Sequence, residues 1–500
     1  MTDANVAVPP PAQGSQGLVL RNTLLLVVAK ATAMPISILL TTMMARYLGP
    51  EDFGYLYLSA TFVGFGFLFV EWGQSGTLPA QVARDRSRAG EVLGSGLAWR
   101  GVSAPVVYAL LAIGCHALGY PWQLQLALAL QSLSIGVGGL LAACQDIVRG
   151  FERTDVAARS LVTNQFLNLL IVPPVLMLGG RLAAVLVASA VVNGIVLLLV
   201  GRALRPVGVG PLIFRRATTR TLVLDGWPFL LTGLTLALQP NIDAVFLSKL
   251  APAEVVGWHA AAYRLLGALV FPAAALVSAL YPTLCRLHAE DQRGFQETAR
   301  GALRTAALVV GPVAFGTAVF ADDVIRLFSR KAFGPAAENL RLYAPFVFLV
   351  YFSMPLGASL MAAGRQRAWA SLQGLCVVTS LILDPVLVPW FQQRMGNGGL
   401  GVCLATVFSE VLMVTGGVWL MPRGVVNRDL ARSIVVTLSA GAAMAFVARL
   451  LSTTSFWAAA PAAGLAYAAV VWVLGGVDEQ QVELLKSIVR RKAAQTADGH

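Results

Sequence analysis

The feature that most constrains this chain is a succession of long apolar stretches separated by short charged segments. A helix needs about 20 apolar residues to cross the hydrocarbon core of a bilayer, and about fourteen such windows can be marked. The predicted spans are residues 22–45, 54–78, 92–114, 123–145, 160–179, 182–203, 224–247, 257–284, 303–321, 341–362, 369–390, 400–421, 433–450 and 457–477. The sequence therefore predicts an all-α, polytopic membrane protein.

Composition supports a surface that faces lipid rather than water. The chain is 57% hydrophobic and only 12% charged, with a mean hydropathy of +0.71, whereas a soluble protein carries roughly a quarter charged residues. In a soluble protein the net charge of +12 would point to a polyanionic partner. Here the positions of the charges matter more than their sum, and a nucleic-acid partner is not predicted.

Arginine in the short loops predicts the orientation, because basic loops resist translocation and stay cytoplasmic. With the N-terminus inside, the segments around 84–88, 149–159, 202–220, 286–300, 365–367 and 423–432 all fall on the cytoplasmic side and are rich in arginine. The opposite loops hold fewer basic residues. We therefore expect both termini to be cytoplasmic and the number of spans to be even.

A weak internal repeat divides the chain into two halves. The stretch at 48–55 (LGPEDFGY) resembles 250–258 (LAPAEVVGW), and 184–189 (AVLVAS) resembles 401–406 (GVCLAT). Transporters are often built from two such repeats, although chance similarity of small apolar residues is the alternative. The predicted organisation is a cytoplasmic tail (1–21), a six-helix lobe (22–203), a cytoplasmic linker (204–223), a second six-helix lobe (224–421), helices 13 and 14 (433–477) and a basic tail (478–500) that is either amphipathic and membrane-bound or simply solvated.

The usual motifs of enzymes do not occur in this sequence. It contains no phosphate-binding Gly-x-x-x-x-Gly-Lys loop, no Gly-x-Ser-x-Gly elbow and no His-x-x-x-His spacing, and its five cysteines form no Cys-x-x-Cys pair. The sequence predicts a transporter rather than an enzyme, with no metal and no cofactor.

Charged residues within predicted spans are the main candidates for function, because ionisable groups at membrane depth are costly and usually face a bundle interior or an aqueous path. Lys30, Glu71 and Arg100 come from the first three spans and fall at one level of the cytoplasmic half. One interpretation is a cationic cavity that Glu71 tunes. The alternative is a structural Lys30–Glu71 pair, or a Lys30 side chain that extends to the membrane surface.

A second group of charges lies near the opposite surface. Asn241 and Asp243 follow Pro240, which should kink the seventh span, and Arg264 is at a similar depth in the eighth. Asp243 and Arg264 are expected to form either a charge-paired gate or cation site, or a plain interhelical salt bridge. Asp384 and Glu410 are further candidates for charge pairing or ion coupling.

At Ala45-Arg46-Tyr47-Leu48-Gly49-Pro50-Glu51-Asp52-Phe53-Gly54 the sequence resembles the Wzx-type polysaccharide-transport flippases of the multidrug/oligosaccharidyl-lipid/polysaccharide exporter superfamily. The similarity continues through 243–249 (DAVFLSK) and 257–265 (GWHAAAYRL), and span order and count agree over most of the chain. Trp258 and Asp384 depart from the residues usual in the family.

The resemblance implies two six-helix lobes around a cavity that opens alternately to each side of a bacterial cytoplasmic membrane. It implies undecaprenyl-pyrophosphate-linked sugars as substrate, coupling to an ion gradient or the membrane potential, and a polysaccharide polymerase and chain-length regulator as partners. On this hypothesis Lys30, Arg100 and Arg264 neutralise phosphate, and Arg46 lies in a gate loop. The alternatives are a cation-coupled drug or metabolite exporter of the same fold, a lipid II flippase, and a membrane-embedded glycan polymerase or transferase, which the short loops disfavour.

Overall fold

The computed structural model describes residues 13–329, 331–422, 424–452 and 455–476. Every regular element in these ranges is an α-helix or a short 3₁₀-helix, which confirms the all-α prediction. The chain divides into two compact units, Met1–Ala244 and Val245–His500. The predicted basic tail (478–500) and most of the predicted N-terminal tail lie outside the described residues.

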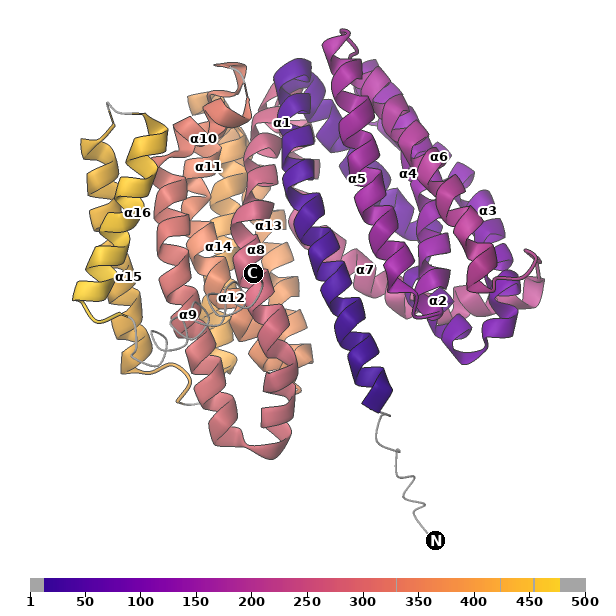
Figure 1. The fold of residues 1–500 in the computed structure, drawn as a ribbon. Coiled ribbons are helices and arrows are strands. Elements are labelled where there is room, and N and C mark those ends of the chain that lie inside the picture. Colours follow the sequence, from indigo (N-terminus) through magenta and orange to yellow (C-terminus); the bar gives the residue numbers. More distant parts are fainter. Residues whose placement is uncertain (1–12, 330, 423, 453–454, 477–500) are drawn as a thin grey trace, which may run out of the picture. The chain divides into compact units, whose positions relative to one another are not determined.

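Unit 1 is a bundle in which α1 packs along α4 and α5, and α4 packs along α6. Its main core gathers aliphatic side chains of α2, α3, α4 and α6, and a smaller one joins α1 to α5 and α6. Its elements, labelled in Figure 1, are α1 (Gln13–Glu71), α2 (Gln74–Arg84), η1 (Arg86–Arg88), α3 (Ala89–Ala117), α4 (Trp122–Gly150), α5 (Thr154–Met177), α6 (Leu182–Val207) and the first part of α7 (Arg216–Leu250).

The helix α1 contains the first predicted span and most of the second, and it is interrupted between them. Gly49 has φ 78° and ψ 172°, a conformation that only glycine adopts without strain, and Pro50 follows it. The break falls within the Leu48-Gly49-Pro50 motif, so this motif marks the junction of two helices. The corresponding motif at 250–258 also marks the junction of two helices, because α7 ends at Leu250 and Pro252 precedes α8.

Unit 2 contains the end of α7 and all later helices. Within it α12 packs against α8, α9 and α14, α13 packs against α14, and the last two helices, α15 and α16, pack on each other and on α9. Its elements are α8 (Ala253–Glu290), α9 (Gln292–Val319), α10 (Ala321–Phe328), η2 (Lys331–Phe333), α11 (Ala336–Leu342), α12 (Ala344–Ala362), α13 (Gln366–Met395), α14 (Gly399–Leu420), α15 (Arg428–Leu450) and α16 (Phe456–Val473).

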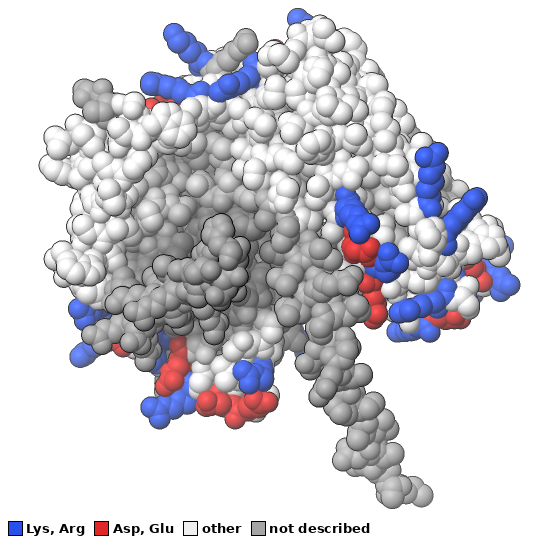
Figure 2. Space-filling view, viewed as in Figure 1, with Lys and Arg blue, Asp and Glu red and all other residues white. Residues whose placement is uncertain are grey.

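Helix lengths agree with a polytopic membrane protein. Twelve stretches within the described residues are long and apolar enough to span a bilayer. The first of them, Thr32–Arg84, contains the break at Gly49 and therefore covers two predicted spans. When this stretch is counted as two spans, the number is 13, which is close to the prediction of about 14 spans. In unit 2 the visible Lys and Arg side chains gather at two ends, with an uncharged band between them (Figure 2).

The predicted linker 204–223 belongs to unit 1 as the end of α6, an extended segment and the start of α7. The extended segment runs along the first turns of α3. There the Ile213 amide donates to the Gly90 carbonyl at 3.3 Å, and the Arg215 amide donates to the Ser95 hydroxyl at 3.1 Å. The linker is therefore bound to the helical bundle through its backbone.

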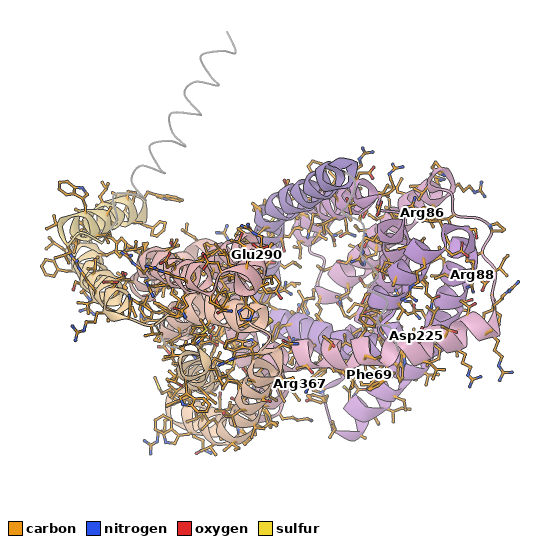
Figure 3. All side chains as sticks on the ribbon, turned by 90° about the horizontal axis from the view of Figure 1, so that it is seen from below. Phe69, Arg86, Arg88, Asp225, Glu290 and Arg367 are labelled. Atoms are coloured by element: carbon orange, nitrogen blue, oxygen red, sulfur yellow. The ribbon has the colours of Figure 1, made fainter. Side chains whose placement is uncertain are left out.

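The first part of α7 lies across one end of unit 1 and is seen side-on in Figure 3, where Asp225 is labelled. Thr218, Leu222, Gly226 and Leu230 recur every four residues and form its buried stripe. The indole of Trp72 donates to the Val223 carbonyl at 3.1 Å. The sequence predicts a span over 224–247 with a kink near Pro240, whereas α7 is a longer helix that continues through 239–241.

Loss of the Glu91 charge should loosen the attachment of the linker and of the start of α7 to α3. The Glu91 carboxylate accepts from Arg88 at 2.7 Å and from the Thr218 hydroxyl, and it lies 3.5 Å from the Arg215 guanidinium. In Glu91→Gln these ion pairs are lost while the shape is kept. Ion pairs of this exposed kind are weak, so local opening should rise by no more than about fivefold. We expect trypsin to cleave after Arg215 faster by up to that factor.

The matched control is Glu152→Gln. The Glu152 carboxylate lies 3.6 Å from Arg86, and both side chains are well exposed. Its cleavage rate after Arg215 should equal that of the wild-type protein. Equal rates for all three proteins would show that Glu91 does not hold the linker.

Candidate functional site

An enclosed cation of unit 1 is Arg100 of α3, whose side chain is 2% exposed. Its Nε donates to Gln74 Oε1 of α2 at 2.9 Å, and one Nη donates to the Gly139 carbonyl of α4. The other Nη lies 3.8 Å from the Asp146 carboxylate, also of α4. The guanidinium lies over the Phe67 ring, with its carbon 5.9 Å from the ring centroid. Arg100 thus joins three helices from within the bundle.

Asp146 connects Arg100 to the surface. Its carboxylate is 1% exposed and is also paired with Arg149, one turn along α4, which is 48% exposed. The sequence analysis selected Arg100 but not Asp146, since Asp146 falls just beyond the predicted span 123–145. The sequence does contain a signal for this residue. Asp146 lies three residues before Arg149 at the end of a span, and this spacing allows the two side chains to pair.

Glu71 lies at the end of α1 and close to this group. Its carboxylate accepts from the Ser75 amide at 2.9 Å, which helps to begin α2, and it interacts electrostatically with Arg100 and Asp146. Two of the three charges predicted to share one level therefore come together. The third, Lys30, lies in α1, and its side chain is outside the described residues.

A second polar cluster in unit 1 is uncharged. Asn164 of α5 donates to Asn193 of α6 at 2.9 Å, and Asn193 donates to the Ser134 carbonyl of α4 at 3.1 Å. Asn168, one turn further along α5, donates to the Asn164 amide oxygen at 3.0 Å. Such side chains commonly link helices in a membrane. The sequence analysis did not select them, although the spacing of Asn164 and Asn168 places both on one face.

The remaining predicted candidates lie at separate positions in the two units. Asp243 is 8% exposed near the end of α7, and the Asn241 amide donates to the Ala237 carbonyl at 3.0 Å. Arg264 is exposed on α8, where His259 is buried and its ring stacks on Tyr263 with centroids 6.0 Å apart. Arg46 is exposed on α1, just before the break at Gly49.

Two acidic side chains are enclosed in unit 2. Glu410 of α14 is 7% exposed and accepts a hydrogen bond from the Ser353 hydroxyl of α12. Asp384 of α13 is 0% exposed. Within the residues that the structure describes, no group of three or more His, Cys, Asp or Glu side chains could hold a metal ion. A carboxylate kept from water is costly unless it is paired or protonated, so these acids stay candidates for charge pairing or ion coupling.

Fold and sites together define a multi-pass helical membrane protein with charges enclosed in each half. The sequence model of the polysaccharide biosynthesis protein family matches residues 19–288, and that of the MatE family matches residues 228–386. Because the first match covers more than half of the chain, the protein belongs to the polysaccharide biosynthesis protein family. This confirms the resemblance found in the sequence. No curated protein matches the chain in sequence.

Solved structures show the same fold. A lipid II flippase, MurJ, in an inward closed conformation superposes with a TM-score of 0.71 at 14% identity, covering 90% of this chain and 98% of that one. An inward-facing multidrug resistance MATE family transporter of the MOP superfamily gives 0.60 at 17% identity, covering 83% and 99%. A MOP superfamily transporter from Pyrococcus furiosus gives 0.54 at 16% identity, covering 80% and 94%.

Proposed function

We propose that this protein is a flippase that moves undecaprenyl-pyrophosphate-linked oligosaccharide repeat units across the bacterial cytoplasmic membrane. The glycan would serve a surface polysaccharide such as lipopolysaccharide O-antigen, capsule or exopolysaccharide. Membership of the polysaccharide biosynthesis protein family is the observation that carries the proposal. The likeness in fold to a lipid II flippase supports it. Two lobes that rock against each other give alternating access to the two sides.

Arg100 supplies the phosphate-binding chemistry in this proposal. A guanidinium presents a planar fork of donors that matches phosphate oxygens, and the contact with Asp146 at 3.8 Å is longer than a hydrogen bond. In the substrate-loaded state Arg100 exchanges Asp146 for the pyrophosphate, and Lys30 and Arg264 add positive charge. The lipid tail stays in the bilayer while the headgroup crosses.

The remaining parts of the proposal concern the cellular setting. Both termini are cytoplasmic, the substrate is delivered from that side, and a polymerase and a chain-length regulator receive the flipped units. An ion gradient or the membrane potential drives the cycle, with Glu71, Asp243, Asp384 and Glu410 as candidate coupling groups.

A strain that lacks the gene tests the substrate. Polyprenyl-linked lipids from this strain are measured by mass spectrometry, and surface glycan is stained in the same cells. The proposal predicts accumulation of a lipid-linked oligosaccharide together with loss of the surface polymer. Unchanged lipids with intact surface glycan would contradict it.

A cation-coupled drug or metabolite exporter is the second candidate. The match of residues 228–386 to the MatE family and the similarity to MATE transporters favour it. Both candidates can use an enclosed acid for coupling, and they differ in cargo. The deletion strain separates them, because an exporter leaves the polyprenyl-linked lipids unchanged and alters drug or metabolite uptake.

Glu410→Gln should uncouple transport from the ion gradient in either candidate. The amide oxygen of Gln can still accept from Ser353, so the fold is retained, whereas the group that binds a proton or cation is lost. We expect gradient-driven transport in proteoliposomes to fall by about tenfold or more. The control is Ser353→Ala, which removes the hydrogen bond but keeps the acid and the response to the gradient. An unchanged response in Glu410→Gln would remove Glu410 from the coupling mechanism.

A further inference from the structure

Unit 2 has a large cavity at the end formed by α10, η2 and α11, which the distribution of arginine in the loops predicts to be non-cytoplasmic. Its volume is about 940 Å³. This end of unit 2 carries one of the two groups of basic side chains visible in Figure 2. The cavity is lined by Asp322, Ile325, Arg326, Ser329, Lys331, Ala332, Gly334 and Ala337.

The charges of this cavity are unbalanced. Its acid, Asp322, is already paired with Arg341 of α11. Arg326 and Lys331 also line it, and neither forms an ion pair with any residue that the structure describes. The lining therefore contains two cations, Arg326 and Lys331, and one acid, Asp322, so its net charge is positive, which favours an anionic occupant.

The wall that carries these cations is held in place by the rest of unit 2. The Trp258 indole of α8 donates to the Ala332 carbonyl at 2.9 Å, and Phe333 is 0% exposed. The Gly334 amide closes a turn on the Lys331 carbonyl at 3.0 Å. The backbone from Lys331 to Gly334 is thus held by these contacts, and the binding of an anion requires little rearrangement of that backbone.

An apolar groove of about 350 Å³ borders α11 as well. Glu338 and Arg341 lie at its polar edge, and the rest of its lining is Leu342, Phe391, Met395, Leu400 and Leu404. Because Arg341 lines the groove and pairs with Asp322 of the cavity, this ion pair connects the two sites. A cationic cavity beside an apolar groove matches the two parts of a charged lipid.

We propose that this end of unit 2 binds a phosphate-bearing lipid. Arg326 and Lys331 hold the phosphate in the cavity, and the groove along α11 accommodates part of the hydrocarbon chain. A membrane phospholipid and an isoprenoid carrier phosphate share this chemistry. The site is separate from the enclosed charges of unit 1, and its occupancy does not require transport.

Binding to the full-length detergent-purified protein tests the proposal. The probes are dioctanoyl phosphatidic acid, farnesyl monophosphate, dioctanoylglycerol and inorganic phosphate, each titrated by microscale thermophoresis. The test variant is Arg326→Gln/Lys331→Gln. The control is Arg293→Gln/Arg449→Gln, which removes the same amount of charge at exposed positions outside both sites. A single Met395→Gln variant tests the groove.

The proposal predicts that at least one phosphate-bearing lipid binds and that the test variant weakens its binding about tenfold, while the control leaves it unchanged. Met395→Gln should weaken the binding of the lipid and leave the binding of inorganic phosphate unchanged. Dioctanoylglycerol should not bind. The tighter of the two lipid probes identifies the source of the phosphate. Equal affinity in test variant and wild type, or inorganic phosphate binding as tightly as both lipids, would overturn the proposal. Neither result bears on translocation, which the deletion strain tests.

Discussion

Arg100→Ala is expected to abolish translocation and to destabilise the protein by about 3 kcal/mol, the lower end of the cost of breaking a buried ion pair. The substitution leaves Asp146 enclosed, with Arg149 as its remaining partner, and removes the bonds to Gln74 and Gly139. The partner Arg149 keeps the cost from being larger. Thermal unfolding of the purified protein and restoration of surface glycan in the deletion strain measure the two effects.

The double variant Arg100→Ala/Asp146→Ala separates structure from substrate binding. The double variant no longer encloses the Asp146 carboxylate without its Arg100 partner. We therefore expect at least about 1 kcal/mol of stability to return relative to Arg100→Ala. If Arg100 only joined helices, transport would return with stability. The proposed contact with pyrophosphate requires transport to stay below about a tenth of the wild-type rate. Recovery of both properties together would contradict a substrate role for Arg100.

Gly226→Ala should be among the most damaging additions of a single methyl group in unit 1. A Cβ at this position of α7 would lie 2.2 Å from the Trp72 carbonyl oxygen, at the point where α7 crosses the chain between α1 and α2. The atom it meets belongs to the backbone, so a side-chain rotation cannot relieve the clash. We expect a loss of about 3 kcal/mol in stability, at the upper end of the cost of overpacking, and faster amide exchange over 218–230.

The matched control is Gly101→Ala in α3. A Cβ there meets no atom within 4 Å, and the residue is in an ordinary helical turn. Because alanine is favoured over glycine in a helix, this variant should be neutral or more stable by about 0.5–1 kcal/mol. Similar destabilisation by both substitutions would show that the close crossing of α7 is not what requires Gly226.

Much of the fold follows from the sequence because the bilayer restricts the possibilities. A spanning segment must satisfy its backbone internally and must have a minimum length, so apolar windows and their punctuation locate helices directly. The motif at Leu48-Gly49-Pro50 shows this well, since it coincides with the break in α1. The course of α7 across unit 1 did not follow from its sequence. Its buried stripe includes Gly226, and hydropathy alone does not distinguish a helix that crosses a bundle from one that crosses a bilayer.

The partners of the site residues could not be predicted in the same way. Depth along a helix follows from counting residues, and it predicted one level for Glu71 and Arg100, which interact electrostatically in the structure. Which side of a helix meets which neighbour depends on rotation and tilt, which counting does not supply. Asp146 and Gln74 therefore emerged only from the structure, as did the contact between Asn164 and Asn193.

Direct observation of lipid translocation tests the central proposal most sharply. The purified protein is reconstituted into liposomes with a fluorescently labelled polyprenyl-pyrophosphate oligosaccharide, and the fraction accessible to an impermeant quencher is followed with time under an imposed ion gradient. The proposal predicts that wild-type protein exposes the pool in the opposite leaflet, while Arg100→Ala/Asp146→Ala, whose folding is checked by thermal unfolding, does not. A rate no faster than that of protein-free liposomes, with active transport of a drug by the same preparation, would contradict it.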